Sequence, residues 1–211
     1  MSSIAVISFE CPPADYSKVS FPNKQRYCDI HGYDFYSFTD KISSRPASWI
    51  KILYIQQVLL NYEWVLWSDA DSYVVNGNRK IEEFTNDCKD LIVCEDDVGI
   101  NFGVFLIKNS DWSNWLLSEI WDFKKYGNNV LGTTTHFVPR TQKIATYNAW
   151  EQTNLHSIVG LHGENFCKNI QCLPEKGDHF NIRPDLATRQ SFMVHHKGGW
   201  RKYRDFLKYI L

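Results

Sequence analysis

Two aspartates lie one residue apart directly after an apolar segment. Residues 64–68 read Trp-Val-Leu-Trp-Ser, which predicts a buried strand, and Asp69 and Asp71 follow at its carboxyl end. In an open α/β sheet that end is where ligands bind. Residues i and i+2 of an extended chain face the same side, so both carboxylates can reach one cation, without which they would repel each other. The pair predicts a site for a hard divalent ion such as Mn²⁺ or Mg²⁺; the alternative is a turn that only ends a strand.

A second group of polar residues lies near the C-terminus. His195 and His196 are followed by Lys197, by a glycine pair that begins at Gly198, and by Lys202. An imidazole can complete a metal shell, glycines let the backbone approach a phosphate, and lysine binds phosphate oxygens. The alternative interpretation is a solvated turn before a basic helix that begins near residue 200.

Two shorter patterns add side chains that could contact a ligand. Asn101 lies in the segment Gly99–Gly103, and its amide could hold a sugar hydroxyl, although glycines are expected in any tight turn. Glu151 and Gln152 are adjacent at the start of an expected helix. Glutamate is favoured in the first turn of any helix, so this pair alone indicates no function.

Strands and helices alternate along the first half of the chain. We expect strands over 3–9, 34–38, 64–68, 91–94, 102–107 and near 192–195, and helices ending near 31 and covering about 46–61, 110–123, 150–159 and 200 onward. Residues 127–147 contain Gly, Thr and Pro without periodicity, which predicts a substrate-covering loop. The pattern predicts an α/β protein with a mixed sheet flanked by helices and a smaller acceptor-side region.

Composition excludes several classes of protein. The chain has 211 residues, which fits one domain, and its 23 basic and 24 acidic residues argue against a nucleic-acid partner. Its six cysteines form no Cys-x-x-Cys pair, so no zinc site is indicated. No signal peptide is recognisable, and no apolar run reaches the roughly 18 residues of a membrane span. We therefore expect a soluble, cytoplasmic protein or the catalytic domain of a longer one.

Several segments together resemble one known family. They are His31-Gly32-Tyr33, Arg45-Pro46-x-x-Trp49-x-Lys51, Glu63-Trp64-x-x-Trp67-x-Asp69-Ala-Asp71, Asn101-x-Gly103 continuing to Ser110-x-Trp112, Glu151-Gln152, and Val194-His195-x-x-Gly198. In this order they resemble successive blocks of glycosyltransferase family 34, which includes fungal α-galactosyl- and mannosyltransferases and plant xyloglucan xylosyltransferases. The resemblance covers about residues 23–200. Members of that family carry an N-terminal membrane anchor, which this chain does not show; a small member without one fits a virus-encoded enzyme.

The resemblance implies a GT-A fold, a UDP-sugar donor, a glycan acceptor, Mn²⁺ and retention of the anomeric configuration. It implies that residues 1–211 form one domain, with a nucleotide-sugar-binding half over about 1–110 and an acceptor-side half over about 111–211 that ends in a metal- and phosphate-binding segment. Asp69, Asp71 and His195 would bind the metal, with His196 as the alternative to His195.

The remaining roles follow from the same resemblance. Catalysis would involve Gln152, beside the anomeric carbon, together with Glu151 and Asp71. Donor binding would involve Ser8, Arg45, Lys51, Asp69, Asn101, Lys197, Gly198 and Lys202.

Two other functions use related features. A nucleotidyltransferase combines the same kind of sheet with paired carboxylates, but it usually has a glycine-rich basic loop after the first strand, where this chain has Glu10-Cys-Pro-Pro. A non-catalytic carbohydrate-binding module with the same fold would be expected to have lost the acidic motif, which is intact here. Both are weaker predictions than a transferase.

Overall fold

A mixed β-sheet forms the centre of the molecule. The computed structural model describes residues 3–85, 88–96, 99–122, 133–138, 143–148 and 150–196. In this part of the chain the main sheet has the strand order β2-β1-β3-β6-β5-β9. Its strands are β1 (Ile4–Phe9), β2 (Asp34–Phe38), β3 (Trp64–Ser68), β5 (Leu91–Asp96), β6 (Gly99–Lys108) and β9 (Ile170–Leu173). β1 pairs in parallel with β2 and β3, whereas β6 runs antiparallel to β3 and β5. The expected mixed α/β sheet is confirmed.

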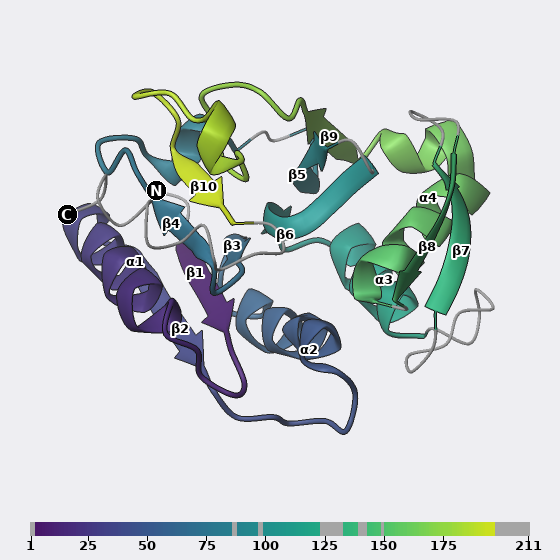
Figure 1. The fold of residues 1–211 in the computed structure, drawn as a ribbon, viewed down its shortest axis with the longest axis horizontal. Coiled ribbons are helices and arrows are strands. Elements are labelled where there is room, and N and C mark those ends of the chain that lie inside the picture. Colours follow the sequence, from purple (N-terminus) through teal and green to yellow (C-terminus); the bar gives the residue numbers. More distant parts are fainter. Residues whose placement is uncertain are drawn as a thin grey trace.

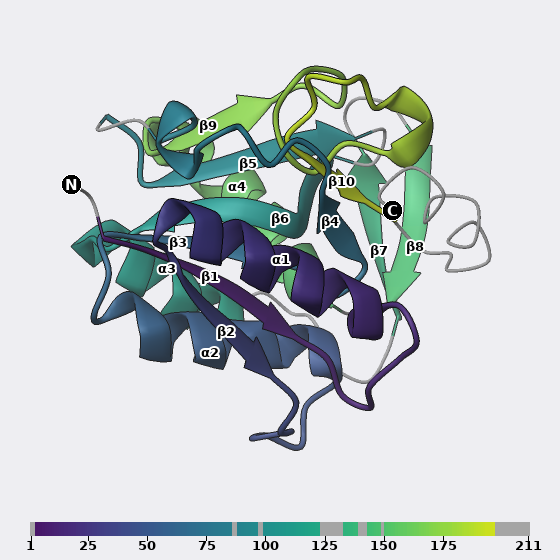
Figure 2. The same ribbon diagram turned by 90° about the vertical axis from the view of Figure 1, so that its left-hand side faces the viewer.

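Helices cover both faces of this sheet (Figures 1 and 2). The helices are α1 (Ser17–His31), α2 (Ala47–Leu59), α3 (Asp111–Trp121) and α4 (Glu151–Cys167). Alternate residues of β1 belong to two separate apolar clusters: Ala5 and Ile7 pack with α2, α3 and α4, whereas Ile4 and Val6 pack with α1. Because both faces are covered, β1 and β3 are buried throughout, which explains their continuous apolar sequences.

Local signals set the ends of three helices. Gly32 ends α1 in the left-handed conformation, with φ of 74°. Pro46 directly precedes α2, and the Ser110 hydroxyl accepts a hydrogen bond from the amide of Ser113 at the start of α3. These three boundaries agree with the sequence prediction.

A small second sheet joins distant parts of the chain. β4 (Ser72–Val74) follows the acidic motif and pairs antiparallel with β10 (Met193–His195). His195 lies opposite Ser72 in this pairing. The strand expected near residues 192–195 is confirmed, whereas β4 was not predicted. The pairing brings a histidine from the end of the described chain to the two aspartates.

The segment 127–147 was predicted wrongly as a loop. It contains β7 (Thr133–Val138) and β8 (Lys143–Asn148), which pair antiparallel. β-Branched residues such as Thr133–Thr135 favour strands, and this propensity outweighs the absence of an apolar pattern. β9 was also missed.

The fourth helix is longer than expected. It continues past Gly160 to Cys167 and is interrupted at Gly163, whose φ of 58° and ψ of −146° are not helical. The predicted basic helix from residue 200 lies outside the described residues. Among the residues that are described, no helix combines the length and apolar character needed to cross a membrane.

Candidate metal and donor site

The acidic motif forms a tight turn between β3 and β4. The amide of Asp69 donates to the carbonyl of Gly103 at 2.8 Å, which ties the motif to β6. The carbonyl of Asp69 accepts hydrogen bonds from the amide of Ser72 (3.0 Å), its hydroxyl (2.6 Å) and Nζ of Lys24 (2.8 Å). Burial lowers the pKa of Lys24 to about 7, against the opposing effect of Asp71 and Asp69. These contacts fix the backbone from which both carboxylates project.

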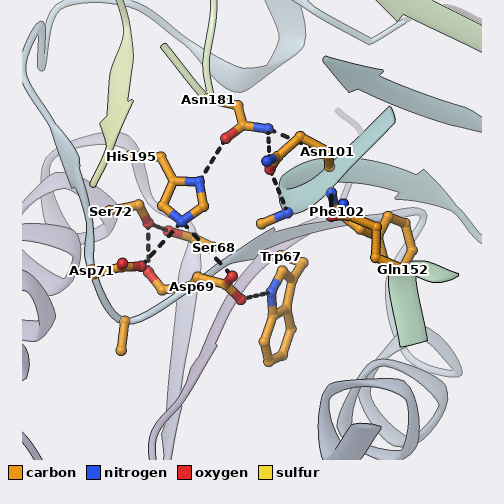
Figure 3. A network of polar contacts seen from close by, with 12 residues as sticks. Trp67, Ser68, Asp69, Asp71, Ser72, Asn101, Phe102, Gln152, Asn181 and His195 are labelled. Carbon is orange, nitrogen blue, oxygen red and sulfur yellow. Dashed lines mark hydrogen bonds and ion pairs between the residues drawn. The ribbon is translucent and has the colours of Figure 1, made fainter. Parts of the chain in front are cut away.

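Asp69, Asp71 and His195 converge on one point (Figure 3). Nε2 of His195 lies 3.1 Å from Oδ1 of Asp71 and 3.9 Å from Oδ2 of Asp69. One potential ligand atom from each residue lies within 4.8 Å of the others, and no other such group occurs among the described residues. The predicted triad is therefore assembled in the structure.

The charges of these groups fit a bound cation. Nδ1 of His195 lies 2.8 Å from the side-chain oxygen of Asn181 and Nε2 faces the two carboxylates. If Nδ1 donates to Asn181, Nε2 carries a lone pair, so His195 and the two carboxylates all present hydrogen-bond acceptors to one another. A positive charge between these three groups would stabilise the arrangement. Burial alone would raise the pKa of Asp71, but the adjacent His195 and Lys24 outweigh it and hold that pKa below its ordinary value. Two carboxylate oxygens and one imidazole nitrogen suit Mn²⁺ or Mg²⁺.

Lys51 fixes the orientation of Asp69. Its Nζ lies 3.2 Å from Oδ1 of Asp69 and 2.8 Å from Oε1 of Glu151, and it donates to the carbonyl of Phe102 at 2.9 Å. The indole of Trp67 donates to the same Oδ1 at 2.7 Å. Oδ1 is thus saturated and Oδ2 faces His195. Burial opposes the charge of Lys51, but the two carboxylates outweigh burial and raise its pKa.

The start of α4 places two predicted catalytic residues against β6. Oε1 of Gln152 accepts a hydrogen bond from the amide of Phe102 at 2.8 Å. Glu151 is buried, with one carboxylate oxygen on Lys51, while Oε2 has no hydrogen-bond partner among the described residues. Through Lys51, this helix start is connected to Asp69.

Three predicted donor contacts are not supported by the side-chain positions. Ser8 is fully buried, and its hydroxyl donates to the carbonyl of Ser68 and accepts from Lys24. The guanidinium of Arg45 lies 3.6 Å from the ring of Trp121 and donates to its carbonyl. The hydroxyl of Ser8 and one nitrogen of Arg45 are thus engaged with other parts of the protein.

The third is Asn101, whose side chain is buried and engaged at both ends. Its nitrogen donates to Asp96 at 2.8 Å, and its oxygen accepts from Gly103 and Asn181. Its amide is therefore engaged within a network of protein hydrogen bonds. Lys51 was also predicted to bind the donor, but its side chain is buried and paired with the carboxylates of Asp69 and Glu151.

The two histidines are clearly distinguished by the structure. The backbone amide of His196 donates to the carbonyl of Asp71 at 3.1 Å, and its ring lies edge-on to Tyr73. Only His195 belongs to the triad. Lys197, Gly198 and Lys202 lie outside the described residues.

Gly103 makes room for the imidazole of His195. A methyl group at this position would lie 2.1 Å from Cε1 of His195 and 2.7 Å from Nδ1. We therefore expect Gly103→Ala to displace the imidazole and to weaken Mn²⁺ binding by about 10–100-fold, the range found for disturbed partners of metal ligands. Titration calorimetry with Mn²⁺ measures this effect.

Gly160→Ala is the matched control, since a methyl group there meets nothing within 4 Å. It should leave Mn²⁺ affinity unchanged and, because alanine favours helices, slightly raise stability. Equal Mn²⁺ affinity in the two variants would show that Gly103 does not position His195.

Comparison with known proteins places this chain in a family. The model of the galactosyl transferase GMA12/MNN10 family matches residues 83–202, more than half of the chain. The chain belongs to this family. A second model, of a family of proteins of unknown function, matches residues 25–137.

Curated relatives of this chain come from fungi and plants. An uncharacterized α-1,2-galactosyltransferase of Schizosaccharomyces pombe, C637.06, is 25% identical over 180 residues, covering 67% of this chain and 52% of the relative. The probable α-1,6-mannosyltransferase MNN10 of Saccharomyces cerevisiae is 27% identical over 142 residues, covering 49% of this chain and 36% of the relative. The chain spans about half the length of such relatives, or less.

Solved structures agree with the fold of this GMA12/MNN10 family member. A glycosyltransferase involved in the glycosylation of the major capsid of PBCV-1 superposes with a TM-score of 0.71 at 19% identity, covering 99% of both chains. The galactosyltransferase LgtC, solved with donor and acceptor sugar analogs, gives 0.54 at 12% identity, covering 92% of this chain and 87% of LgtC. The fold is GT-A, as the family resemblance implied.

Proposed function

We propose that this chain is a metal-dependent, retaining glycosyltransferase that moves a sugar from a UDP-sugar to a carbohydrate hydroxyl. The convergence of Asp69, Asp71 and His195 at the end of β3 and β10 is the observation that carries the proposal. Membership of the GMA12/MNN10 family and the GT-A fold support it. Among the relatives, C637.06 is described as an α-1,2-galactosyltransferase.

The residues of the triad would hold a divalent cation, Mn²⁺ or Mg²⁺. When bound, that ion neutralises the charge that develops on the leaving nucleoside diphosphate. The chain itself supplies the geometry: Lys51 and Trp67 hold one oxygen of Asp69, so the other oxygen points towards Asp71 and His195. These contacts orient the carboxylate of Asp69 without any ligand, and such preorganisation favours stabilisation of a developing charge.

Retention is best explained by attack from the face that the phosphate leaves. The acceptor hydroxyl then transfers its proton to the departing phosphate oxygen, and no side chain has to act as a general base. The amide of Gln152 agrees with this mechanism, and the carboxylate of Glu151 is buried with Oε1 paired to Lys51. We assign Gln152 to positioning and charge stabilisation beside the anomeric carbon.

Gln152→Ala should slow the chemical step more than it weakens donor binding. We expect kcat to fall by about 100-fold, comparable to removal of one stabilising donor in other enzymes, while the Kd for UDP changes little. Steady-state kinetics and UDP calorimetry separate the two quantities. The control is Gln57→Ala on the exposed side of α2, which should behave like wild type. An unchanged kcat in Gln152→Ala would remove this residue from the mechanism.

Product analysis tests the proposed reaction. The protein is incubated with Mn²⁺, a panel of UDP-sugars and glycoside acceptors, and the anomeric configuration of the product is read by proton NMR. A product with the donor's configuration supports the proposal, whereas an inverted product contradicts the mechanism. Formation of a nucleotide sugar from a nucleoside triphosphate and a sugar phosphate would instead favour a nucleotidyltransferase. Glycan binding without any turnover would favour a carbohydrate-binding module.

A further inference from the structure

Three buried polar side chains, those of Asn181, Asn101 and Asp96, follow one another behind His195. Figure 3 shows the first two beside the imidazole. Nδ1 of His195 is 2.8 Å from Oδ1 of Asn181. Nδ2 of Asn181 donates to Oδ1 of Asn101 at 2.9 Å, and Nδ2 of Asn101 donates to Oδ2 of Asp96 at 2.8 Å. Asp96 ends β5, Asn101 belongs to β6, and Asn181 precedes β10, so the row connects three separate parts of the fold. We call Asp96, Asn101 and Asn181 the amide relay.

The backbone fixes the direction of every hydrogen bond in the relay. An amide side chain can usually be turned over, exchanging its donor and acceptor atoms. Here the backbone N–H of Gly103 donates to the side chain of Asn101 at 3.0 Å, so the accepting atom must be its oxygen. The nitrogen of Asn101 then faces the carboxylate of Asp96, which accepts.

The orientation of Asn181 follows from that of Asn101. Its nitrogen faces two acceptors of Asn101, the side-chain oxygen at 2.9 Å and the backbone carbonyl at 3.3 Å. The oxygen of Asn181 must therefore face Nδ1 of His195, and it can only accept a hydrogen bond. Nδ1 consequently carries the hydrogen, and in the neutral imidazole the lone pair lies on Nε2, the atom that faces Asp69 and Asp71.

We propose that the amide relay is a positioning device that holds His195 as the Nδ1–H tautomer and aims the Nε2 lone pair at the cation position. This inference rests on the proposed function, because the proposed metal-dependent reaction is what gives the cation a role. Asn181 has φ of 64°, a left-handed conformation that is uncommon outside glycine and costs free energy. The side chain of Asn181 is fully buried. Its amide supplies contacts that glycine, the residue best suited to this backbone, would lack.

Asn181→Gly isolates the effect of the side chain. Glycine adopts a φ of 64° without strain, so the substitution deletes the amide and preserves the backbone. Asn181→Asp keeps an acceptor for Nδ1 of His195 but cannot donate to Asn101. Asn169→Ala is the control, since it removes an amide that donates to Asp90 at 2.5 Å, near β9.

The first readout is ¹⁵N NMR of the imidazole in the metal-free protein, at a pH about two units above the ordinary histidine pKa. We expect the Nδ1–H tautomer of His195 in wild type, in Asn181→Asp and in Asn169→Ala, and a mixture of tautomers in Asn181→Gly. The second readout is calorimetric Mn²⁺ affinity, which should fall by about 10–100-fold in Asn181→Gly and stay within about threefold of wild type in Asn169→Ala.

A single Nδ1–H tautomer together with wild-type Mn²⁺ affinity in Asn181→Gly would overturn the relay. Failure of the proposed function would look different: wild-type protein would then bind no Mn²⁺, while the tautomer of His195 would still depend on Asn181. The NMR readout needs neither metal nor donor, so the two failures are distinguishable.

Discussion

Asp71→Ala is expected to abolish Mn²⁺-dependent sugar transfer. Removal of this carboxylate takes away one of the three proposed ligands and leaves only Asp69 and His195 at the candidate metal position. A bound metal ion contributes several kcal/mol of charge stabilisation, and about 1.4 kcal/mol corresponds to a factor of ten in rate. We therefore expect kcat/KM for the UDP-sugar to fall by at least about a thousandfold in steady-state assays with saturating Mn²⁺.

The matched control for this prediction is Asp15→Ala. Asp15 is exposed and forms a surface ion pair with Lys18, a kind of contact that contributes little. Its variant should retain the activity and the melting temperature of wild type. If Asp71→Ala also retained full activity with Mn²⁺, the metal-dependent mechanism would be wrong.

Lys51→Met should produce the largest loss of stability. The substitution leaves the carboxylate of Glu151 buried without its counter-charge, and it removes a donor to Asp69. Breaking a buried ion pair by deleting one partner costs about 3–5 kcal/mol. Urea unfolding followed by circular dichroism measures this change, which corresponds to a fall in melting temperature of about 6–20 °C for a chain of this size.

The double variant Lys51→Met/Glu151→Gln separates charge from packing. Removing both charges avoids the uncompensated carboxylate, so the double variant should regain much of the stability lost in the single variant. If both variants were equally unstable, the effect would come from packing around Lys51 and not from its pairing with Glu151. If Lys51→Met were as stable as wild type, the buried ion pair between Lys51 and Glu151 would contribute nothing to the stability of the fold.

The two aspartates of the candidate metal site could be predicted because their signal is local. Asp69 and Asp71 end an apolar strand, and the period of a strand places them on the same side. The two adjacent histidines stood out by their local pattern with Gly and Lys, and the family resemblance favoured His195 with His196 as the alternative. The choice between them depends on the pairing of β10 with β4, which places His195 opposite Ser72. Such long-range pairing leaves no mark in the sequence around residue 195.

Several roles could not be predicted because they depend on tertiary packing. Lys51 and Asn101 look like ligand-binding residues in a motif, but both are buried and engaged with other side chains. Asn181 lies between Phe180 and Ile182 with no motif around it, and its role depends on three elements that meet at His195. Lys24 was missed for the same reason, since its Nζ reaches the carbonyl of Asp69 from α1, which is distant in the sequence.

The missed strands β7 and β8 have a different explanation. Prediction over residues 127–147 relied on an alternation of apolar and polar side chains, which a threonine-rich strand does not show. The β-branched residues at 133–135 were the available signal, and they were outweighed by the Gly and Pro residues nearby. Propensity, not periodicity, would have identified this pair of strands.

Calorimetric titration of UDP into the protein, with and without Mn²⁺, tests the central claim most directly. The account predicts binding that requires Mn²⁺ and that is lost in His195→Ala, because the imidazole and the two aspartates would hold the ion that contacts the diphosphate. UDP binding of equal strength with and without Mn²⁺, or retained in His195→Ala, would contradict the assignment of this triad as the metal site. Absence of nucleotide binding under both conditions would contradict the transferase function itself.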